Sequence, residues 1–190
     1  MTPNNDSATK LFIESFLRLD NIPEYHEEIV YIRNLLDNGL EKKTAEQFFE
    51  QYVWCVLNAG MKEQIARKIW ERYLENLDPF VVGHLGKRKA IETGLKNYVK
   101  WFGELKCRKD KIKYLESLPW IGPITKYHLA RNIGIDTVKP DRHLVRLSDR
   151  FGFKTPLKLC EHVKNEIGGS EKVGLIDLVF WRAANLGWLS

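Results

Sequence analysis

The chain has 190 residues, of which 44% are hydrophobic and 12% aromatic, so it can bury a core and is not a disordered tail. No run approaches roughly 18 apolar residues, and the N-terminus lacks the charged and apolar segments of a secretory signal. We therefore expect a protein without a membrane partner, located either in the cytoplasm, in association with the nucleoid, or in the nucleus.

The net charge of +5 is unevenly distributed along the chain. Residues 1–50 carry five basic and ten acidic side chains, residues 62–113 fourteen and seven, and residues 114–190 eleven and eight. The basic middle contains Lys87-Arg88-Lys89 and a second cluster over 106–113, which could neutralise the phosphates of a polyanion. A charge run is also typical of a solvated helix face, so charge alone leaves both interpretations open.

Helical periodicity dominates, and no stretch alternates strictly enough to predict a strand. In chain order, helices are predicted over 8–19, 24–38, 45–57, 62–76, 87–103, 109–117, 123–133, 141–151, 156–167 and 171–187. Ten short helices joined by short turns predict an all-α protein, a class that by itself implies no function.

Local signals sharpen several of these predictions. The segment 45–57 repeats apolar residues with helical spacing and so predicts one continuous buried stripe. Thr155 and Pro156 are typical of an N-cap and first helical residue, Gly168 of a helix stop, and Ser170 of the next N-cap. The three cysteines show no metal-binding spacing, which favours buried or partly buried thiols and no metal site. They are Cys55, Cys107 and Cys160.

The segment Ser117–Gly122 leaves room only for a tight connection, so it predicts a helix-hairpin-helix turn. The amides that open the next helix, with the side chains of Thr125 and Lys126, could donate to a phosphate oxygen. An ordinary corner between two helices, with Leu118 and Ile121 buried, is the alternative.

Asp141 follows a proline and precedes the predicted helix 141–151. By itself it is most simply an N-cap, worth about 1 kcal/mol.

Taken together, the order Leu-Pro-x-Ile-Gly, a helix, and Asp-x-His-Leu-x-Arg resembles the helix-hairpin-helix (HhH-GPD) DNA glycosylase superfamily. Asp141, His143 and Arg146 match that family's aspartate, histidine and arginine, and the resemblance covers roughly residues 44–151. It implies an all-α, two-lobed fold with the active-site cleft between the lobes. One lobe would be a helical barrel over 41–138 that includes the hairpin 117–126, and the other would combine 8–40 with 139–190.

The resemblance also implies the activity: flipping a damaged or mispaired base out of double-stranded DNA and hydrolysing its N-glycosidic bond. Asp141 would be the catalytic carboxylate. Ile124 stands where bifunctional members carry their Schiff-base lysine, which favours a monofunctional enzyme with water as nucleophile. Lys139 is the remaining amine, so lyase activity stays open.

Further site residues follow from the same resemblance. Asn58 or Met61 would fill the gap in the duplex, since Gly60 replaces the glutamine wedge of endonuclease III-like members. The hairpin would bind DNA through Leu118, Trp120, Gly122, Ile124, Thr125 and Lys126. The base pocket would be lined by Ile124, Tyr127, His128, Trp181 and Tyr25.

Two departures from the family pattern matter. Trp120 replaces the first hairpin glycine, so either the turn adapts or it binds phosphate less well. Only Cys160 follows Asp141, so no iron–sulfur cluster is expected, and the chain resembles the cluster-free alkylation-repair branch. We expect no cofactor beyond a monovalent cation at the hairpin, and a monomer. A non-catalytic DNA-structure binder and an all-α protein-interaction module are the alternatives.

Overall fold

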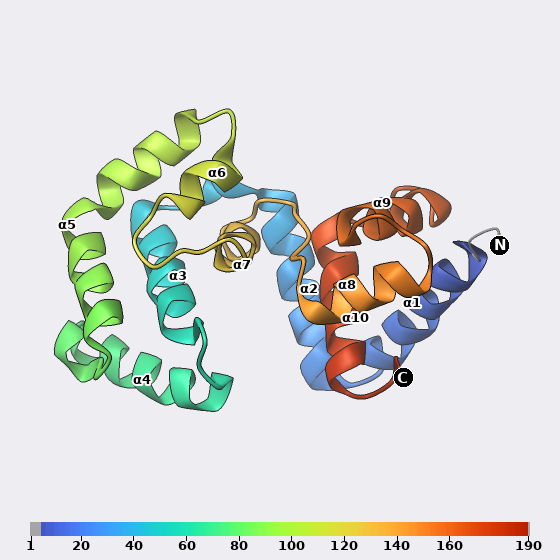
Figure 1. The fold of residues 1–190 in the computed structure, drawn as a ribbon, viewed down its shortest axis with the longest axis horizontal. Coiled ribbons are helices and arrows are strands. Elements are labelled where there is room, and N and C mark those ends of the chain that lie inside the picture. Colours follow the sequence, from blue (N-terminus) through green and yellow to red (C-terminus); the bar gives the residue numbers. More distant parts are fainter. Residues whose placement is uncertain (1–4, 190) are drawn as a thin grey trace. The chain divides into compact units, whose positions relative to one another are not determined.

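The computed structural model describes residues 5–189, in which all regular structure is helical and no strand occurs (Figure 1). The predicted all-α class is confirmed, and each predicted helix is present with ends shifted by a few residues. Two short 3-10 helices, η1 and η2, were not predicted. The elements are α1 (Asn5–Asp20), α2 (Pro23–Asn38), η1 (Leu40–Lys42), α3 (Ala45–Asn58), α4 (Glu63–Asn76), η2 (Pro79–Val81), α5 (Leu85–Cys107), α6 (Lys111–Glu116), α7 (Thr125–Asn132), α8 (Arg142–Arg150), α9 (Pro156–Glu166) and α10 (Val173–Asn185).

The chain divides into two compact units. Unit 1 comprises the residues up to Gly39 and those from Gly134 onward, and it contains α1, α2 and α8 to α10. Unit 2 is Leu40–Ile133, with α3 to α7. The sequence places the corresponding boundaries at 40/41 and 138/139.

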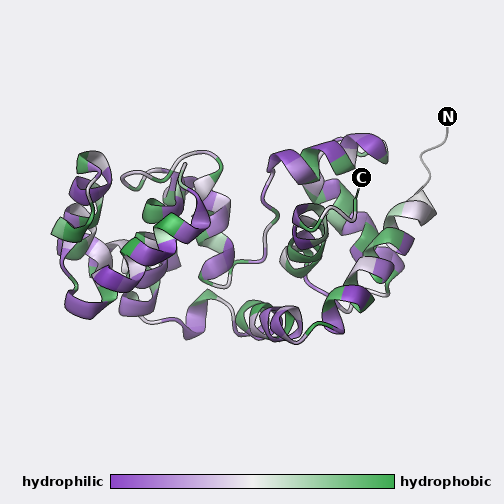
Figure 2. Cartoon of the chain, turned by 90° about the horizontal axis from the view of Figure 1, so that it is seen from below, coloured by the Kyte–Doolittle hydropathy of each residue, from purple (hydrophilic) through white to green (hydrophobic). Residues whose placement is uncertain are grey.

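The centre of unit 1 is α10, which contacts α1, α2, α8 and α9. Every residue from Val173 to Phe180 is buried. A helix that is apolar on all sides has no solvent face and so becomes the core of its unit, and the other helices of unit 1 pack their apolar stripes around it. Figure 2 shows hydrophobic and hydrophilic residues alternating along the surrounding helices, as amphipathic helices require.

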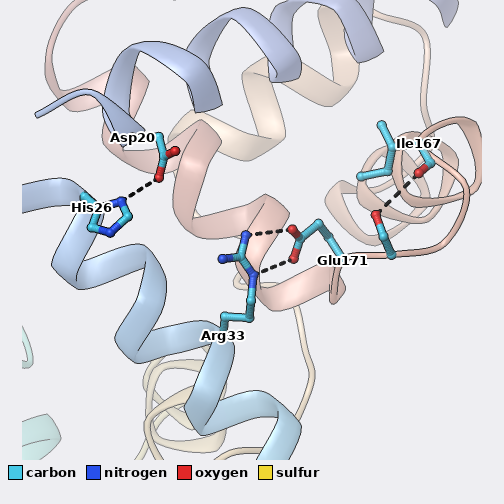
Figure 3. A network of polar contacts seen from close by, with 6 residues as sticks. Asp20, His26, Arg33, Ile167 and Glu171 are labelled. Carbon is cyan, nitrogen blue, oxygen red and sulfur yellow. Dashed lines mark hydrogen bonds and ion pairs between the residues drawn. The ribbon is translucent and has the colours of Figure 1, made fainter.

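Ion pairs connect α2 to the end of α1 and to the segment before α10. Arg33 of α2 binds Glu171, just before α10, through two hydrogen bonds of 2.7 and 3.2 Å (Figure 3). The hydrogen bond that Arg33 donates to Glu171 raises the pKa of Arg33 above its ordinary value, which favours the charged guanidinium. His26 at the start of α2 contacts Asp20 at the end of α1, with 2.9 Å between the ring nitrogen and the carboxylate.

Unit 2 is built around α3, which packs on α4, α5 and α7. Its predicted stripe is buried apart from half-buried Ala45, and Cys55 is buried with it. Close packing against α5 depends on Gly94, because a Cβ there would lie 2.8 Å from the rings of both Phe49 and Tyr52. A larger residue at 94 would force the two helices apart.

The predicted helix starts at 155 and 170 had different outcomes. Thr155 is the N-cap of α9, with its hydroxyl accepting from the Lys158 amide at 3.2 Å, and Pro156 is the first helical residue. The prediction for Ser170 was wrong: α10 starts after Lys172, and the Ser170 hydroxyl instead donates to the Ile167 carbonyl at 3.4 Å (Figure 3). The amide of Gly174 finds its acceptor elsewhere, in Asp136.

Candidate functional site

Asp141 is the N-cap of α8, as the simplest interpretation of the sequence predicted. Its Oδ1 accepts hydrogen bonds from the amides of His143 (2.9 Å) and Leu144 (3.1 Å). Within the described residues its Oδ2 accepts none, and the side chain is only half-buried. One carboxylate atom is therefore fixed by the helix, while the other is available to an external group.

Two other carboxylates hold the loop that leads to Asp141. Asp177 lies 1% exposed in α10 and accepts from the Lys139 amide at 3.2 Å. Asp136 of the loop accepts from the Gly174 amide of α10 at 2.8 Å. The loop therefore both donates a hydrogen bond to α10 and accepts one from it. Asp177 was not singled out from the sequence, although an acid inside an otherwise apolar helix is the signal that could have found it.

The same group of acids affects the neighbouring thiol. Burial raises the pKa of Cys160 well above its ordinary value, and the nearby charges of Asp177 and Asp136 raise it further. Cys160 and Cys55 are buried, as predicted, but Cys107 at the end of α5 is exposed, so the prediction was wrong for that thiol.

Lys139 lies two residues before Asp141 and is half-buried. Its amide and carbonyl are both used, the carbonyl by the Asp141 amide at 2.8 Å. Its ammonium makes no ion pair in the part of the chain that the structure describes. The backbone of Lys139 is thus fixed, whereas its side-chain ammonium is available to a ligand.

The segment between α6 and α7 forms a tight hairpin. The Leu118 amide donates to Leu115 (3.1 Å), and the Ile121 amide donates back to Leu118 (3.1 Å). The side chains of Leu118 and Ile121 are buried, as the helix-corner interpretation required, so Leu118 could meet a ligand only through its backbone. The hydroxyl of Tyr52 in α3 holds the hairpin in place, because it donates a hydrogen bond of 2.9 Å to the Pro119 carbonyl.

Trp120 occupies the tip of the hairpin with a φ of +65°, the left-handed region that favours glycine. The turn therefore keeps the glycine-like conformation although a tryptophan is present. The indole lies over Gly86, where a Cβ would be 2.5 Å from the ring, and against His84, with 5.0 Å between ring centroids. The side chain is 41% exposed, so one part of the ring is packed and the other faces solvent.

Several backbone amides at the start of α7 have no hydrogen-bond acceptor in the described residues. The amides of Gly122, Ile124 and Thr125 donate to no acceptor in residues 5–189, as expected for the first turn of a helix. Lys126, however, is already engaged: its Nζ lies 2.6 Å from Glu116 Oε2, and this hydrogen bond raises the pKa of Lys126. The amides are available to an anion, whereas Glu116 already offsets the charge of the Lys126 ammonium.

The predicted pocket face of α7 is only partly exposed. Ile124 is exposed, and Tyr127 and His128 are half-buried. The Lys126 ammonium lies 5.3 Å from the centre of the Tyr127 ring. These side chains follow one another along one side of α7, at the spacing that the sequence indicated.

The turn after α3 is fixed by a buried lysine. Lys87 of α5 is 3% exposed and donates to the carbonyls of Leu57 (2.6 Å) and Ala59 (2.8 Å), at the C-terminal end of α3. Gly60 then has a φ of +67°, and half-buried Met61 follows it. Asn58 is also half-buried. The predicted gap-filling turn is therefore held in one conformation by Lys87.

This position of Lys87 corrects the interpretation of the basic block. Lys87 cannot meet a polyanion, and burial lowers its pKa. Arg88 donates to the Val82 carbonyl at 3.1 Å and lies over the Phe80 ring, so Lys89 is the one exposed residue of the triplet. In the second cluster, the Lys106 ammonium lies 3.4 Å from the Glu41 carbonyl. The positive charge of the sequence is thus partly used to hold the helices of unit 2 together.

The two pocket residues predicted in unit 1, Trp181 and Tyr25, both contact Arg182. Arg182 lies over the rings of both Trp181 (4.8 Å) and Tyr25 (5.1 Å), and it binds Glu28 through two hydrogen bonds of 2.6 and 3.0 Å. Trp181 and Tyr25 therefore do belong to one cluster. A guanidinium covers one face of each ring, so a ligand could stack only on the other.

No family model, no curated protein and no solved structure matched the chain when it was compared with them. Within residues 5–189, no helix has both the length and the hydropathy needed to cross a bilayer. In the same part of the chain, no set of three or more His, Cys, Asp or Glu side chains is arranged to hold a metal ion.

Proposed function

We propose that the chain is a DNA glycosylase of the helix-hairpin-helix superfamily, which extrudes a damaged or mispaired base from double-stranded DNA and hydrolyses its N-glycosidic bond. The observation that carries this proposal is the hydrogen bonding of the Asp141 carboxylate. Its carboxylate is oriented by the helix through one oxygen and leaves the other available, in a segment whose Asp-x-His-Leu-x-Arg sequence follows a helix-hairpin-helix turn.

The chemistry suits such a carboxylate. Breaking the N-glycosidic bond builds positive charge on the sugar, and a fixed anion near C1′ stabilises that charge and orients or deprotonates an attacking water. The cap bonds of Asp141 keep the carboxylate pointing one way, so no free energy is spent on orienting it during the reaction. The buried Asp177 supports this role because it fixes the preceding loop.

Unit 2 supports the proposal through the hairpin. A helix N-terminus whose amides lack acceptors attracts a phosphate oxygen, and the exposed part of Trp120 offers an aromatic surface beside it. In this proposal, units 1 and 2 correspond to the two lobes of the superfamily. Ile124 in place of a lysine favours a monofunctional enzyme, with Lys139 as the amine to test for lyase activity.

The decisive experiment is a base-release assay by mass spectrometry on duplexes carrying alkylated, oxidised and mismatched bases, with and without an alkaline cleavage step. Asp141→Asn keeps an oxygen for the helix cap and removes the charge, so the fold should persist while base release falls by at least about 100-fold. Duplex affinity should stay within a few-fold of the wild type. Wild-type base release that is unchanged in Asp141→Asn would reject the mechanism.

A non-catalytic DNA-structure binder is the second candidate, favoured by Ile124 at the position of the Schiff-base lysine and by Trp120 at the glycine position. It predicts salt-dependent duplex binding by the wild type with no free base from any lesion. If duplex binding does not weaken with salt, both candidates fail and a protein-interaction module is the better description.

A further inference from the structure

Unit 1 contains a cavity of about 310 Å³ on α8 and the end of α10, which neither the proposed mechanism nor the hairpin uses. Three basic side chains, those of His143, Arg146 and Arg150, line one part of it. Among residues 5–189, no acidic side chain lines the cavity. Its remaining lining residues are Leu147, Ala184, Gly187 and Leu189.

The basic side chains occupy one side of α8 by their spacing. Positions 143, 146 and 150 are separated by three and four residues, so their side chains project from the same side of the helix. Arg150 donates to the Leu189 carbonyl at 3.2 Å, and His143 contacts the neighbouring Arg142 at 3.4 Å. Arg146 is exposed and makes no hydrogen bond or ion pair in the described residues. The whole Arg146 guanidinium is therefore available to a ligand, whereas Arg150 uses part of its guanidinium on Leu189.

Backbone hydrogen bonds hold the other lining segment, which follows α10. The Trp188 amide donates to the Ala183 carbonyl at 2.9 Å, and the Leu186 amide donates to Arg182 at 3.0 Å. Arg18 lies 4.0 Å over the Trp188 ring and covers it from the side of α1. The cavity is thus formed by a packed segment with an apolar surface that includes Ala184 and Leu189.

The shape and polarity of the cavity indicate what it accommodates. A guanidinium binds a phosphate through paired hydrogen bonds, whereas an apolar wall suits carbon atoms. The cavity volume of about 310 Å³ leaves room for more than one phosphate group. The ligand should therefore carry a phosphate and an attached, largely apolar group of about the size of a sugar.

We infer that this cavity binds a sugar-phosphate unit of the DNA backbone, with Arg146 as the main phosphate ligand. The inference rests on the proposed function for the identity of the ligand. Arg146 lies five residues after Asp141, a rise of about 7.5 Å along the helix axis. The same helix would then present a carboxylate at its start and a phosphate anchor within about a nucleotide of it.

The test compares Arg146→Gln with Lys154→Gln, which removes one exposed charge from the same unit away from the cavity. Fluorescence anisotropy on a short undamaged duplex gives the binding constant over a range of salt concentrations. Losing one phosphate contact should reduce the slope of log K against log salt by about 0.9 for Arg146→Gln and leave it unchanged for Lys154→Gln. Arg146→Lys should retain most of the slope, and circular dichroism checks that all three variants are folded.

A second measurement identifies the source of the phosphate. Inorganic phosphate, added to isotopically labelled protein, should shift the amide signals of α8 and of residues 187–189 in the wild type and not in Arg146→Gln. Shifts with phosphate but an unchanged duplex slope would overturn the DNA assignment in favour of a small phosphorylated ligand. Neither shifts nor a slope change would overturn the site itself.

Base release measured on the same proteins separates this inference from the proposed function. If the wild type releases no base but Arg146→Gln loses slope, the glycosylase proposal fails and the backbone site stands. If the wild type releases base and the slope of Arg146→Gln equals that of the wild type, the glycosylase proposal stands and the backbone site fails.

Discussion

Gly86 lies directly beneath the indole of Trp120, so closely that a single added methyl group would be 2.5 Å from the ring. This contact positions the exposed tip of the hairpin from a different helix, α5. A change at position 86 is therefore a way to move Trp120 without mutating it.

We expect Gly86→Ala to displace the Trp120 ring and to lower the free energy of unfolding by about 1–3 kcal/mol, because overpacking forces neighbours out of place. Urea unfolding and tryptophan fluorescence measure the two effects. Gly103→Ala is the matched control, since it lies in the same helix with nothing within 4 Å of its Cβ. It should stabilise the protein by up to about 1 kcal/mol. Equal effects at both positions would contradict the contact.

Lys87 provides a prediction about the turn after α3. Lys87→Met keeps the length of the side chain but leaves the carbonyls of Leu57 and Ala59 without their donor, so the free energy of unfolding should fall by about 1–3 kcal/mol. Lys89→Met, on the exposed side of the same helix, should change it by no more than about 0.5 kcal/mol. Equal losses in both variants would contradict a stabilising role for the Lys87 hydrogen bonds.

Loss of the hydroxyl should lower the free energy of unfolding at one buried tyrosine and not at another. Tyr52→Phe removes the hydrogen bond to Pro119 and should cost about 1–2 kcal/mol at neutral pH. The Tyr73 hydroxyl is buried and has no hydrogen-bond partner in the described residues, so Tyr73→Phe should be neutral or stabilising. Thermal unfolding of both variants at pH 7 tests this contrast, and a larger loss for Tyr73→Phe would contradict it.

Tyr73 also predicts a dependence on alkaline pH. Burial raises its pKa to about 12, whereas in the unfolded chain it ionises near pH 10. The unfolded state therefore loses the proton first, and the stability present below about pH 10 declines as the pH rises towards 12. Tyr73→Phe lacks this loss, so its free energy of unfolding relative to that of the wild type should increase with pH. Urea unfolding at about pH 9 and about pH 11, one unit below and above the ordinary tyrosine pKa, measures the increase. A constant difference would rule out the linkage.

The Lys126–Glu116 pair predicts a gain of function. Glu116→Gln releases the ammonium beside the hairpin amides, so duplex binding should strengthen and the slope of log K against log salt should steepen by about 0.9. Glu71→Gln, an exposed site in the same unit, gives the same change in net charge without releasing Lys126. An identical effect in both variants would show that only net charge matters.

These results indicate how far the sequence alone could lead. The stripe of α3, the Thr155 cap and the Asp141 cap are local, since the deciding residues lie within four positions of one another, and all three were predicted. The helix ends marked by glycine were predicted for the same reason. Local patterns thus specified the helices and the residues at their starts.

The predictions that failed or were missed depend on contacts far apart in sequence. Lys87 was assigned to the surface because lysine usually lies there, but its partners are about thirty residues away, at Leu57 and Ala59. Ser170 was chosen as a cap because its residue type is favoured, while the Gly174 amide is served by Asp136. Periodicity cannot reveal such pairs, because it contains no information about which helices meet.

The contact between Gly39 and Gly134 has a consequence for the architecture of the chain. A Cβ on Gly134 would lie 2.8 Å from the carbonyl carbon of Gly39, so the polypeptide leaves unit 1 and re-enters it at nearly one point. Unit 2 is therefore an insertion in unit 1, and its two points of attachment are adjacent. Excising 40–133 and joining Gly39 to Gly134 through a few flexible residues should leave unit 1 able to fold.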